Sequence, residues 1–118
     1  MKPMSPRSLN RKAVALRVHA PVFAALGDET RLALVSKLAD GRSHSISQLT
    51  KGSKLTRQAI TKHLRVLQRA GVVRCDRQGR ESRFEFAPEP IDDIRQYLDL
   101  VSRQWDRALS RLKEFVES

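Results

Sequence analysis

The stretch Lys54–Gly71, KLTRQAITKHLRVLQRAG, decides the fold of this chain. When it is wound at about 100° per residue, an apolar row falls on one side. That row consists of Ile60, Leu64 and Leu67. Thr56 suits the N-cap, where a hydroxyl accepts a backbone N–H of the first turn. Gly71 suits the position just past the helix, where glycine adopts the left-handed conformation of a Schellman motif. We therefore predict a helix over residues 56–70 with one buried face.

The opposite face of this predicted helix carries hydroxyl, amide, ammonium and guanidinium groups and no carboxylate. Its residues are Thr56, Arg57, Gln58, Thr61, Lys62 and Arg65. Such groups bind phosphates and read base edges in the major groove of nucleic acid. Gln58 and Thr61 suit base edges, whereas Lys62 and Arg65 suit sequence-independent contacts. Arg57 is compatible with either a guanine or a phosphate. His63 lies at the margin of the apolar row, so we expect a packed, hydrogen-bonded histidine.

The segments before this helix predict a helix-turn-helix. Ser45-Ile46-Ser47-Gln48 fits a capping box at the start of a short helix, which Gly52 ends. Asp28 suits the N-cap of an earlier helix that stops at Gly41, with Leu32, Val35 and Leu38 expected to face inward. A short helix, a tight turn and a basic helix are typical of a helix-turn-helix.

The first residues of the chain predict little regular structure. Residues 1–8 contain two prolines and no apolar period, so we expect disorder there. A weakly helical pattern follows, and we expect Pro21 to end or restart it. Residues 1–18 form a basic tail with five Lys and Arg side chains and no acidic one. Contacts with a nucleic-acid backbone and a purely solubilising role are equally compatible with it.

The period changes from helical to two after Gly71, which predicts a β-hairpin over residues 72–86, here called the wing. We place Gln78-Gly79 at the turn, because glycine supplies the positive φ that such turns need. Pairing Arg77 with Arg80 then sets the register. The wing tip projects Arg77, Gln78 and Arg80 next to the helix-turn-helix.

The wing contains the only cysteine of the chain, which excludes an internal disulfide. The register places Cys75 on the same face as Val73 and Phe84, so we interpret it as a small buried residue. A redox role for Cys75 stays open, although no second cysteine is present to resolve a sulfenic acid.

Residues 88–118 predict a long final helix after Pro88. Its apolar side chains recur every three or four residues: Ile94, Tyr97, Leu98, Val101, Trp105, Leu109 and Leu112. A stripe this long is best buried against a second copy of itself, which predicts a homodimer. The alternative is packing within one chain.

The formal net charge of +10 is concentrated on the predicted helix and the wing. Residues 51–83 carry ten Lys and Arg side chains against two acidic ones, whereas residues 84–118 carry five against eight. A basic segment of this kind is typical of a surface that binds a polyanion. A merely solvated basic surface is the alternative, and the position of the charge favours nucleic acid.

Three motifs in this order resemble the bacterial ArsR family of winged helix-turn-helix repressors. They are LGDETRL at residues 26–32, KHLRVLQRAGVV at residues 62–73 and GRE at residues 79–81. The resemblance covers residues 20–116. It implies a mainly α fold with a small β-hairpin, in the order of four helices, two strands and a final helix. It also implies a dimer through the terminal helices and repression from a palindromic operator. We divide the chain into a tail (1–18), a winged helix-turn-helix domain (19–87) and a dimerisation helix (88–118).

Much of that family senses metal ions, and here the chain departs from it. The stretch Ser45–Thr50 lacks the cysteine pair of the best-known metal sensors, and the final helix lacks histidine. His19, His44, His63 and Cys75 are scattered over different predicted elements. Because a zinc site needs about four converging ligands, we predict no metal and no cofactor.

The leading hypothesis is therefore a dimeric, sequence-specific DNA-binding repressor. The runner-up is a non-specific architectural DNA-binding protein, and a third hypothesis is a protein-interaction module built on the final helix. No catalytic constellation is recognisable, so we expect no enzyme. No apolar run is long enough to span a bilayer and no signal peptide is recognisable, so we expect a soluble cytoplasmic protein. The sequence does not identify an effector.

Overall fold

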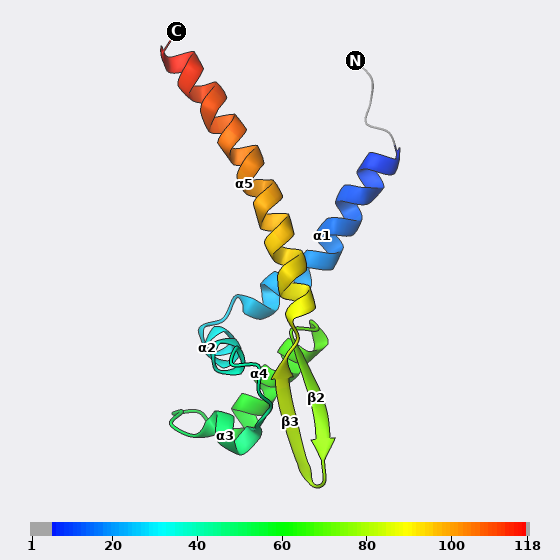
Figure 1. The fold of residues 1–118 in the computed structure, drawn as a ribbon, viewed down its shortest axis with the longest axis vertical. Coiled ribbons are helices and arrows are strands. Elements are labelled where there is room, and N and C mark those ends of the chain that lie inside the picture. The colour runs from blue at the N-terminus through cyan, green and yellow to red at the C-terminus, as the bar shows by residue number, and fades with distance from the viewer. Residues whose placement is uncertain (1–5, 118) are drawn as a thin grey trace.

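The computed structural model describes the backbone of residues 6–117 and the side chains of residues 16–117. Residues 6–117 form five helices and three short strands (Figure 1). In chain order these are α1 (Pro6–Leu26), α2 (Glu29–Leu38), β1 (His44–Ser45), α3 (Ile46–Thr50), α4 (Arg57–Arg69), β2 (Val73–Gln78), β3 (Glu81–Phe86) and α5 (Pro88–Glu117). The predicted mainly α fold with a β-hairpin is confirmed, with one strand more than predicted.

The molecule has two ends (Figure 1). Helices α1 and α5 cross and then diverge, so that their far ends project away from the rest of the chain. The wing (β2 and β3) and α3 lie at the other end. The radius of gyration is 19.4 Å, against about 13 Å for a compact domain of 100 residues. The diverging helices account for this excess, and they also place the start of α1 far from the wing tip.

Helix α4 begins and ends as its local sequence predicts. The Thr56 hydroxyl accepts the backbone N–H of Ala59 at 3.1 Å. At the other end, Gly71 has φ +80°, and Val72 N–H donates to the Leu67 carbonyl at 3.0 Å, which is the long bond of a Schellman motif. These caps fix the length of the helix, so its basic face always contains the same residues.

The core lies between α4, the wing and the ends of α1, α2 and α5. Its most buried side chains are Val22, Leu34, Leu38, Leu49, Ile60, Leu64, Leu67, Val72, Val73, Phe84 and Ile94. The predicted apolar row of α4 is thus confirmed. The expectation that Leu32 faces inward is wrong, because its side chain is 51 % exposed while Leu34 is buried. The helical period of α2 is compatible with either Leu32 or Leu34 facing inward, and packing of α2 against α4 buries Leu34.

The predicted register of the hairpin is wrong by one pair on each strand. Gln78 pairs with Glu81, so the two-residue loop is Gly79-Arg80 and not Gln78-Gly79. Gly79 has φ +64°, and a positive φ at the first loop position is the requirement of a type II′ turn. The shift preserves the predicted faces, since it moves the pairing by an even number of residues.

The true register improves the charge pairing across the wing. Arg74 now pairs with Glu85, and Asp76 with Arg83, so directly opposed residues carry opposite charges. Arg74 Nε lies 3.6 Å from Glu85 Oε1. The predicted register opposes like charges on this face, so electrostatics adds to the turn geometry in selecting the observed one.

The sheet has a third strand that the sequence did not predict. Strand β1 has two residues and pairs antiparallel with β3, so the order is β1-β3-β2. It leads directly into α3, where Ser45 and Gln48 form the predicted capping box. The third strand therefore joins the wing to the first helix of the helix-turn-helix.

Helix α1 corrects two expectations for the start of the chain. Pro21 lies inside the helix and does not end it. Proline in a helix interior costs about 3 kcal/mol. Val22 and Ala25, which follow it, are buried in the core and offset that cost. The expected disorder of residues 1–8 is wrong for residues 6–8, which belong to α1; residues 1–5 lie outside the described residues.

Candidate nucleic-acid interface

The outward face of α4 presents the predicted basic and polar side chains to solvent. Arg57, Gln58, Lys62 and Arg65 are exposed. Thr61 is half-buried, and its hydroxyl donates to the Arg57 carbonyl at 2.7 Å, which leaves the hydroxyl oxygen as an acceptor. The Thr56 hydroxyl is occupied as the N-cap acceptor, although the residue is exposed. The face therefore offers donors, and none of its own side chains is a carboxylate.

A shallow hollow of about 330 Å³ lies against the first two turns of α4. Its lining consists of Ile46, Arg57, Gln58, Thr61 and Lys62. Four of these are predicted site residues, so the structure brings them together on one concave surface. Ile46 was not predicted as a site residue. Its half-buried side chain also supplies an apolar wall, a surface that suits a thymine methyl group.

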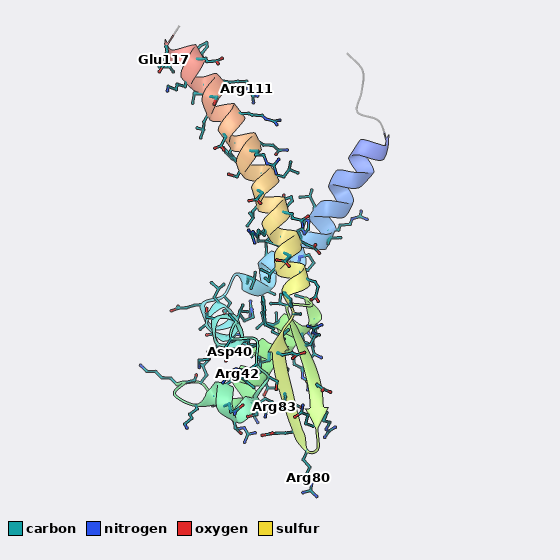
Figure 2. The ribbon with its side chains drawn as sticks, in the orientation of Figure 1. Asp40, Arg42, Arg80, Arg83, Arg111 and Glu117 are labelled. Atoms are coloured by element: carbon teal, nitrogen blue, oxygen red, sulfur yellow. The ribbon has the colours of Figure 1, made fainter. Side chains whose placement is uncertain are left out.

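The wing tip adds a second group of exposed donors. Arg77, Gln78 and Arg80 are all exposed, and the Arg80 side chain extends beyond the end of the hairpin (Figure 2). Within residues 16–117, no ion pair involves these arginines or the predicted basic residues of α4. Cations without counter-charges suit a polyanion such as nucleic acid.

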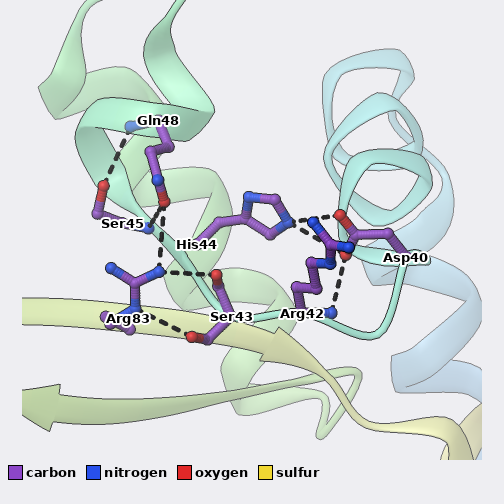
Figure 3. Close-up of polar contacts among 7 residues, drawn as sticks. All are labelled: Asp40, Arg42, Ser43, His44, Ser45, Gln48 and Arg83. Carbon is purple, nitrogen blue, oxygen red and sulfur yellow. Dashed lines mark hydrogen bonds and ion pairs between the residues drawn. The ribbon is translucent and has the colours of Figure 1, made fainter.

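The wing is held against the helix-turn-helix by Arg83, whose side chain is 21 % exposed. Its Nε donates to Ser43 Oγ at 2.9 Å, and Nη2 donates to the Ser43 carbonyl at 2.9 Å (Figure 3). Nη2 also lies 3.5 Å from Gln48 Oε1, which accepts the Ser45 backbone N–H in the capping box. These contacts of Arg83 were not predicted from the sequence, because its Ser43 partner is 40 residues away.

A neighbouring contact stiffens the same loop. His44 Nε2 lies 2.9 Å from Asp40 Oδ2 (Figure 3). The backbone N–H of Arg42 and then the His44 ring hold the pKa of Asp40 below its ordinary value of 3.8, because both stabilise the carboxylate. The loop between α2 and β1 is thus held by side chains from both of its ends.

Helix α4 is held from the other side by Arg31 and His63. Arg31 donates to the Ala24 and Ala25 carbonyls at the end of α1, and its Nη1 lies 3.3 Å from His63 Nδ1. Because arginine has no acceptor, the His63 nitrogen accepts this bond. The predicted packed, hydrogen-bonded histidine is confirmed. Arg31 thereby connects α1, α2 and α4, a role that the sequence did not reveal.

Asp28 belongs to the same cluster and caps α2, as predicted. Its Oδ2 accepts the Arg31 backbone N–H at 3.0 Å and lies 3.8 Å from His63 Nδ1. The backbone hydrogen bond from Arg31 is the main cause that holds the pKa of Asp28 below its ordinary value of 3.8. The carboxylate therefore stays ionised where α1, α2 and α4 meet.

Comparisons with known proteins assign this geometry to a family. The pattern of the family described as "Helix-turn-helix domain" matches residues 26–76. The HTH-type transcriptional regulator Rv2034 of Mycobacterium tuberculosis is 35 % identical over 97 residues, which cover 81 % of this chain and 86 % of that protein. The solved ArsR-like transcriptional regulator from Rhodococcus sp. RHA1 is 35 % identical, covers 84 % of this chain and 92 % of its own, and superposes with a TM-score of 0.73.

This chain belongs to the ArsR family. It is a DNA-binding transcriptional regulator with a winged helix-turn-helix. The solution structure of Mb0332 from Mycobacterium bovis, described as a homodimeric winged helix-turn-helix DNA-binding domain, shares the fold with a TM-score of 0.64 at 23 % identity. That structure covers 88 % of this chain and 92 % of its own.

The ArsR-family chain leaves most of its final helix uncovered. Trp105 is 65 % exposed, Leu109 57 % and Leu112 58 %, and Leu98 is also exposed. Val101 is half-buried. Ile94 differs from the other predicted interface residues, since it is buried in the core of its own chain. Its position leaves little surface for a partner.

Tyr97 lies where α5 crosses α1. Its ring centroid is 4.9 Å from that of His19 and 6.1 Å from that of Phe23. These ring contacts fix the crossing point, beyond which α1 and α5 diverge (Figure 1). The exposed apolar residues of α5 lie past this point.

Three further features of the regulator concern its cysteine, metal ligands and membrane spans. Cys75 is half-buried and packs against the core, as predicted from the faces of the wing. Among the described residues, no three His, Cys, Asp or Glu side chains gather as a metal site would require. No helix in residues 6–117 combines the length and apolar character that crossing a membrane demands.

Proposed function

We propose that this regulator binds a palindromic operator as a homodimer and represses transcription there. The observation that carries the proposal is the outward face of α4, which joins base-reading and phosphate-binding groups on one surface beside the wing tip. Gln58 and Thr61 act as readers in this proposal. Arg57, Lys62 and Arg65 supply phosphate contacts, and Arg77, Gln78 and Arg80 extend them from the wing.

The exposed apolar stripe of α5 supports the homodimer. Trp105, Leu109 and Leu112 are each more than half exposed, and burial of such surface is worth about 25 cal/mol per Å². A second copy offers the same stripe, so an isologous interface buries both at once. The homodimeric description of Mb0332 supports the same arrangement. Leu98, Val101 and the free edge of Tyr97 complete the proposed interface.

A two-fold dimer places two copies of α4 on one side of a duplex. Helix-turn-helix dimers bind half-sites whose centres lie about 34–36 Å apart, one turn of DNA. A dimer on such a site blocks access of the transcription machinery to a promoter, which is the proposed route of repression. No catalytic step enters this proposal, and its place of action is the compartment that contains the chromosome.

Genomic footprinting of the regulator in its native host tests the proposal. We expect protection of a few promoters, each containing a palindrome with half-sites about one turn apart. Transcript levels from these promoters should rise when the regulator is deleted. Uniform coating of the chromosome would instead support a non-specific architectural role, and falling transcript levels would support activation.

A further inference from the structure

A second, smaller hollow lies between α3, the start of α4 and the wing. Its volume is about 150 Å³, and it is walled by Ser47, Arg57, Ser82, Arg80 and Glu81. Sites for drug-sized ligands usually span about 300–1,000 Å³, so this space suits a small group and not an organic effector. Two of these elements, α4 and the wing, are those that the proposed function places on DNA.

Three of the side chains around this hollow are donors without partners. Within the described residues, no hydrogen bond holds the hydroxyl of Ser47 or Ser82, and no ion pair holds the guanidinium of Arg57. Hydroxyl and guanidinium donors are the side-chain groups that most often contact phosphate oxygens in protein–DNA complexes. Arginine in particular binds phosphate with two parallel hydrogen bonds.

One carboxylate also borders the hollow, and it is already paired. Glu81 Oε2 lies 3.3 Å from Arg83 Nη1, so the Arg83 charge offsets it. The Arg83 Nε and Nη2 atoms donate to Ser43, in the loop before β1, and Nη2 also lies 3.5 Å from Gln48 Oε1 on α3, so Arg83 links the wing to α3 (Figure 3). These bonds hold the elements around the hollow in place, while the side chains of Ser47, Arg57 and Ser82 stay without partners among the described residues.

We propose that this hollow is a seat for one backbone phosphate of DNA, held by Ser47, Arg57 and Ser82. The inference rests on the proposed DNA-binding function and adds Ser47 and Ser82 to its residues. Arg80 also borders the seat, but its side chain extends past the hairpin (Figure 2) and reaches the next part of the backbone. The seat thus binds the wing and α4 to the same strand of the DNA duplex.

Replacing Ser47 with aspartate tests the seat, with Ser110→Asp as the matched control. Both serines are exposed, and either substitution adds one negative charge. Ser110 lies on α5, away from the wing and α4. Ser47 is outside the capping box, and an acidic residue in a first helical turn favours folding. Thermal unfolding of both variants checks that the fold is retained.

The probe is a random-sequence duplex two helical turns long, titrated at several NaCl concentrations. We expect Ser47→Asp to weaken binding at least about tenfold at low salt, because its carboxylate would face a phosphate at contact distance. The slope of log affinity against log salt should fall by about one, and Ser110→Asp should change neither quantity. Equal affinities for the two variants would overturn the seat while leaving the proposed function intact. Absence of wild-type binding to both this duplex and the footprinted operator would overturn the proposed function.

A double-mutant cycle shows whether Ser47 and Arg57 hold the same phosphate. We expect Ser47→Asp to cost a smaller fold-change in affinity when Arg57→Ala is already present, because the two residues share a partner. Effects that multiply would assign them to separate phosphates and overturn a shared seat. Inorganic phosphate tests whether the hollow binds a free phosphate ion instead of a backbone phosphate of DNA. A phosphate-dependent rise in Tm that Ser47→Asp abolishes, with DNA affinity unchanged, would overturn the DNA assignment.

Discussion

The molecule has a reading end, formed by α3, α4 and the wing, and an arm end, formed by the diverging parts of α1 and α5. The two ends leave different kinds of surface without a partner. At the reading end, α4 and the wing bury most of their apolar side chains and leave cations without counter-charges. At the arm end, α5 pairs some of its charges, as in the contact of Lys113 with Glu117, and leaves large apolar side chains in solvent. The unpaired cations suit DNA as a partner, and the exposed apolar side chains suit a second copy of the chain.

This difference separates two physical contributions to operator binding. Unpaired cations give an interaction that weakens as salt rises, because bound counterions are released from DNA. Exposed apolar side chains give an interaction that depends on buried area and much less on salt. In this account, α4 and the wing determine what is bound, and α5 determines how many chains bind it.

The largest expected effect concerns the arm end. Leu109→Glu should abolish dimerisation and weaken operator binding about a hundredfold or more, ~2.8 kcal/mol, because it places a charge in the apolar interface. Sedimentation equilibrium and DNA titration measure the two quantities. Leu100→Glu is the matched control, since Leu100 is similarly exposed on α5 but lies off the apolar stripe. Equal effects of the two variants would contradict the assignment of the stripe.

The next effect concerns base reading at the other end. Gln58→Ala should cost about 1–3 kcal/mol at particular base pairs of the operator and leave binding to random DNA nearly unchanged. Titration against operator variants with single base-pair changes identifies the positions. If operator and random DNA lose affinity equally, Gln58 is not a reader.

A smaller effect should appear when a phosphate contact is removed. Lys62→Ala should weaken binding to all sequences alike and lower the salt slope by about one. Lys113→Ala removes the same charge from the arm end and should leave the slope unchanged. A lower slope for both variants would mean that net charge, and not its position on α4, governs binding.

The smallest effect lies at the joint between the two ends. The folded-state pKa of Asp28 is lowered, so its carboxylate stabilises the fold at pH values above 3.8 and this contribution is lost as pH falls through the lowered value. Asp28→Asn keeps a capping side chain but cannot titrate. The Tm advantage of wild type over Asp28→Asn should therefore shrink on acidification. A constant difference would show that the charge of Asp28 contributes nothing.

Much of the reading end was predictable because its signals are local. The caps of α4 and its apolar row depend on residues within a few positions of one another. The polar face, with Arg57, Gln58 and Lys62, follows from that row. The existence of the wing and its inward face were predictable for the same reason, since both depend on a period of two.

The remaining features depend on contacts between distant segments. Strand β1 exists because His44 and Ser45 meet β3 about 40 residues later, and the Arg83 contacts depend on the same pairing. The choice of Leu34 over Leu32 reflects packing of α2 against α4, which a helical period cannot decide. The hairpin register required knowing whether Gly79 is the first or the second residue of the loop. Local pattern therefore predicted the reading face, whereas the walls of the phosphate seat required the fold.

The proposal that α5 brings two reading ends to one DNA is best tested by comparing binding to a whole operator and to a half operator. A footprinted operator and a fragment with one half-site are titrated with the wild-type protein, and the mass of each complex is measured. The account predicts two chains on the palindrome, with half-sites about one turn apart, and much weaker binding to the half-site fragment. One chain bound to each fragment with equal affinity would contradict it.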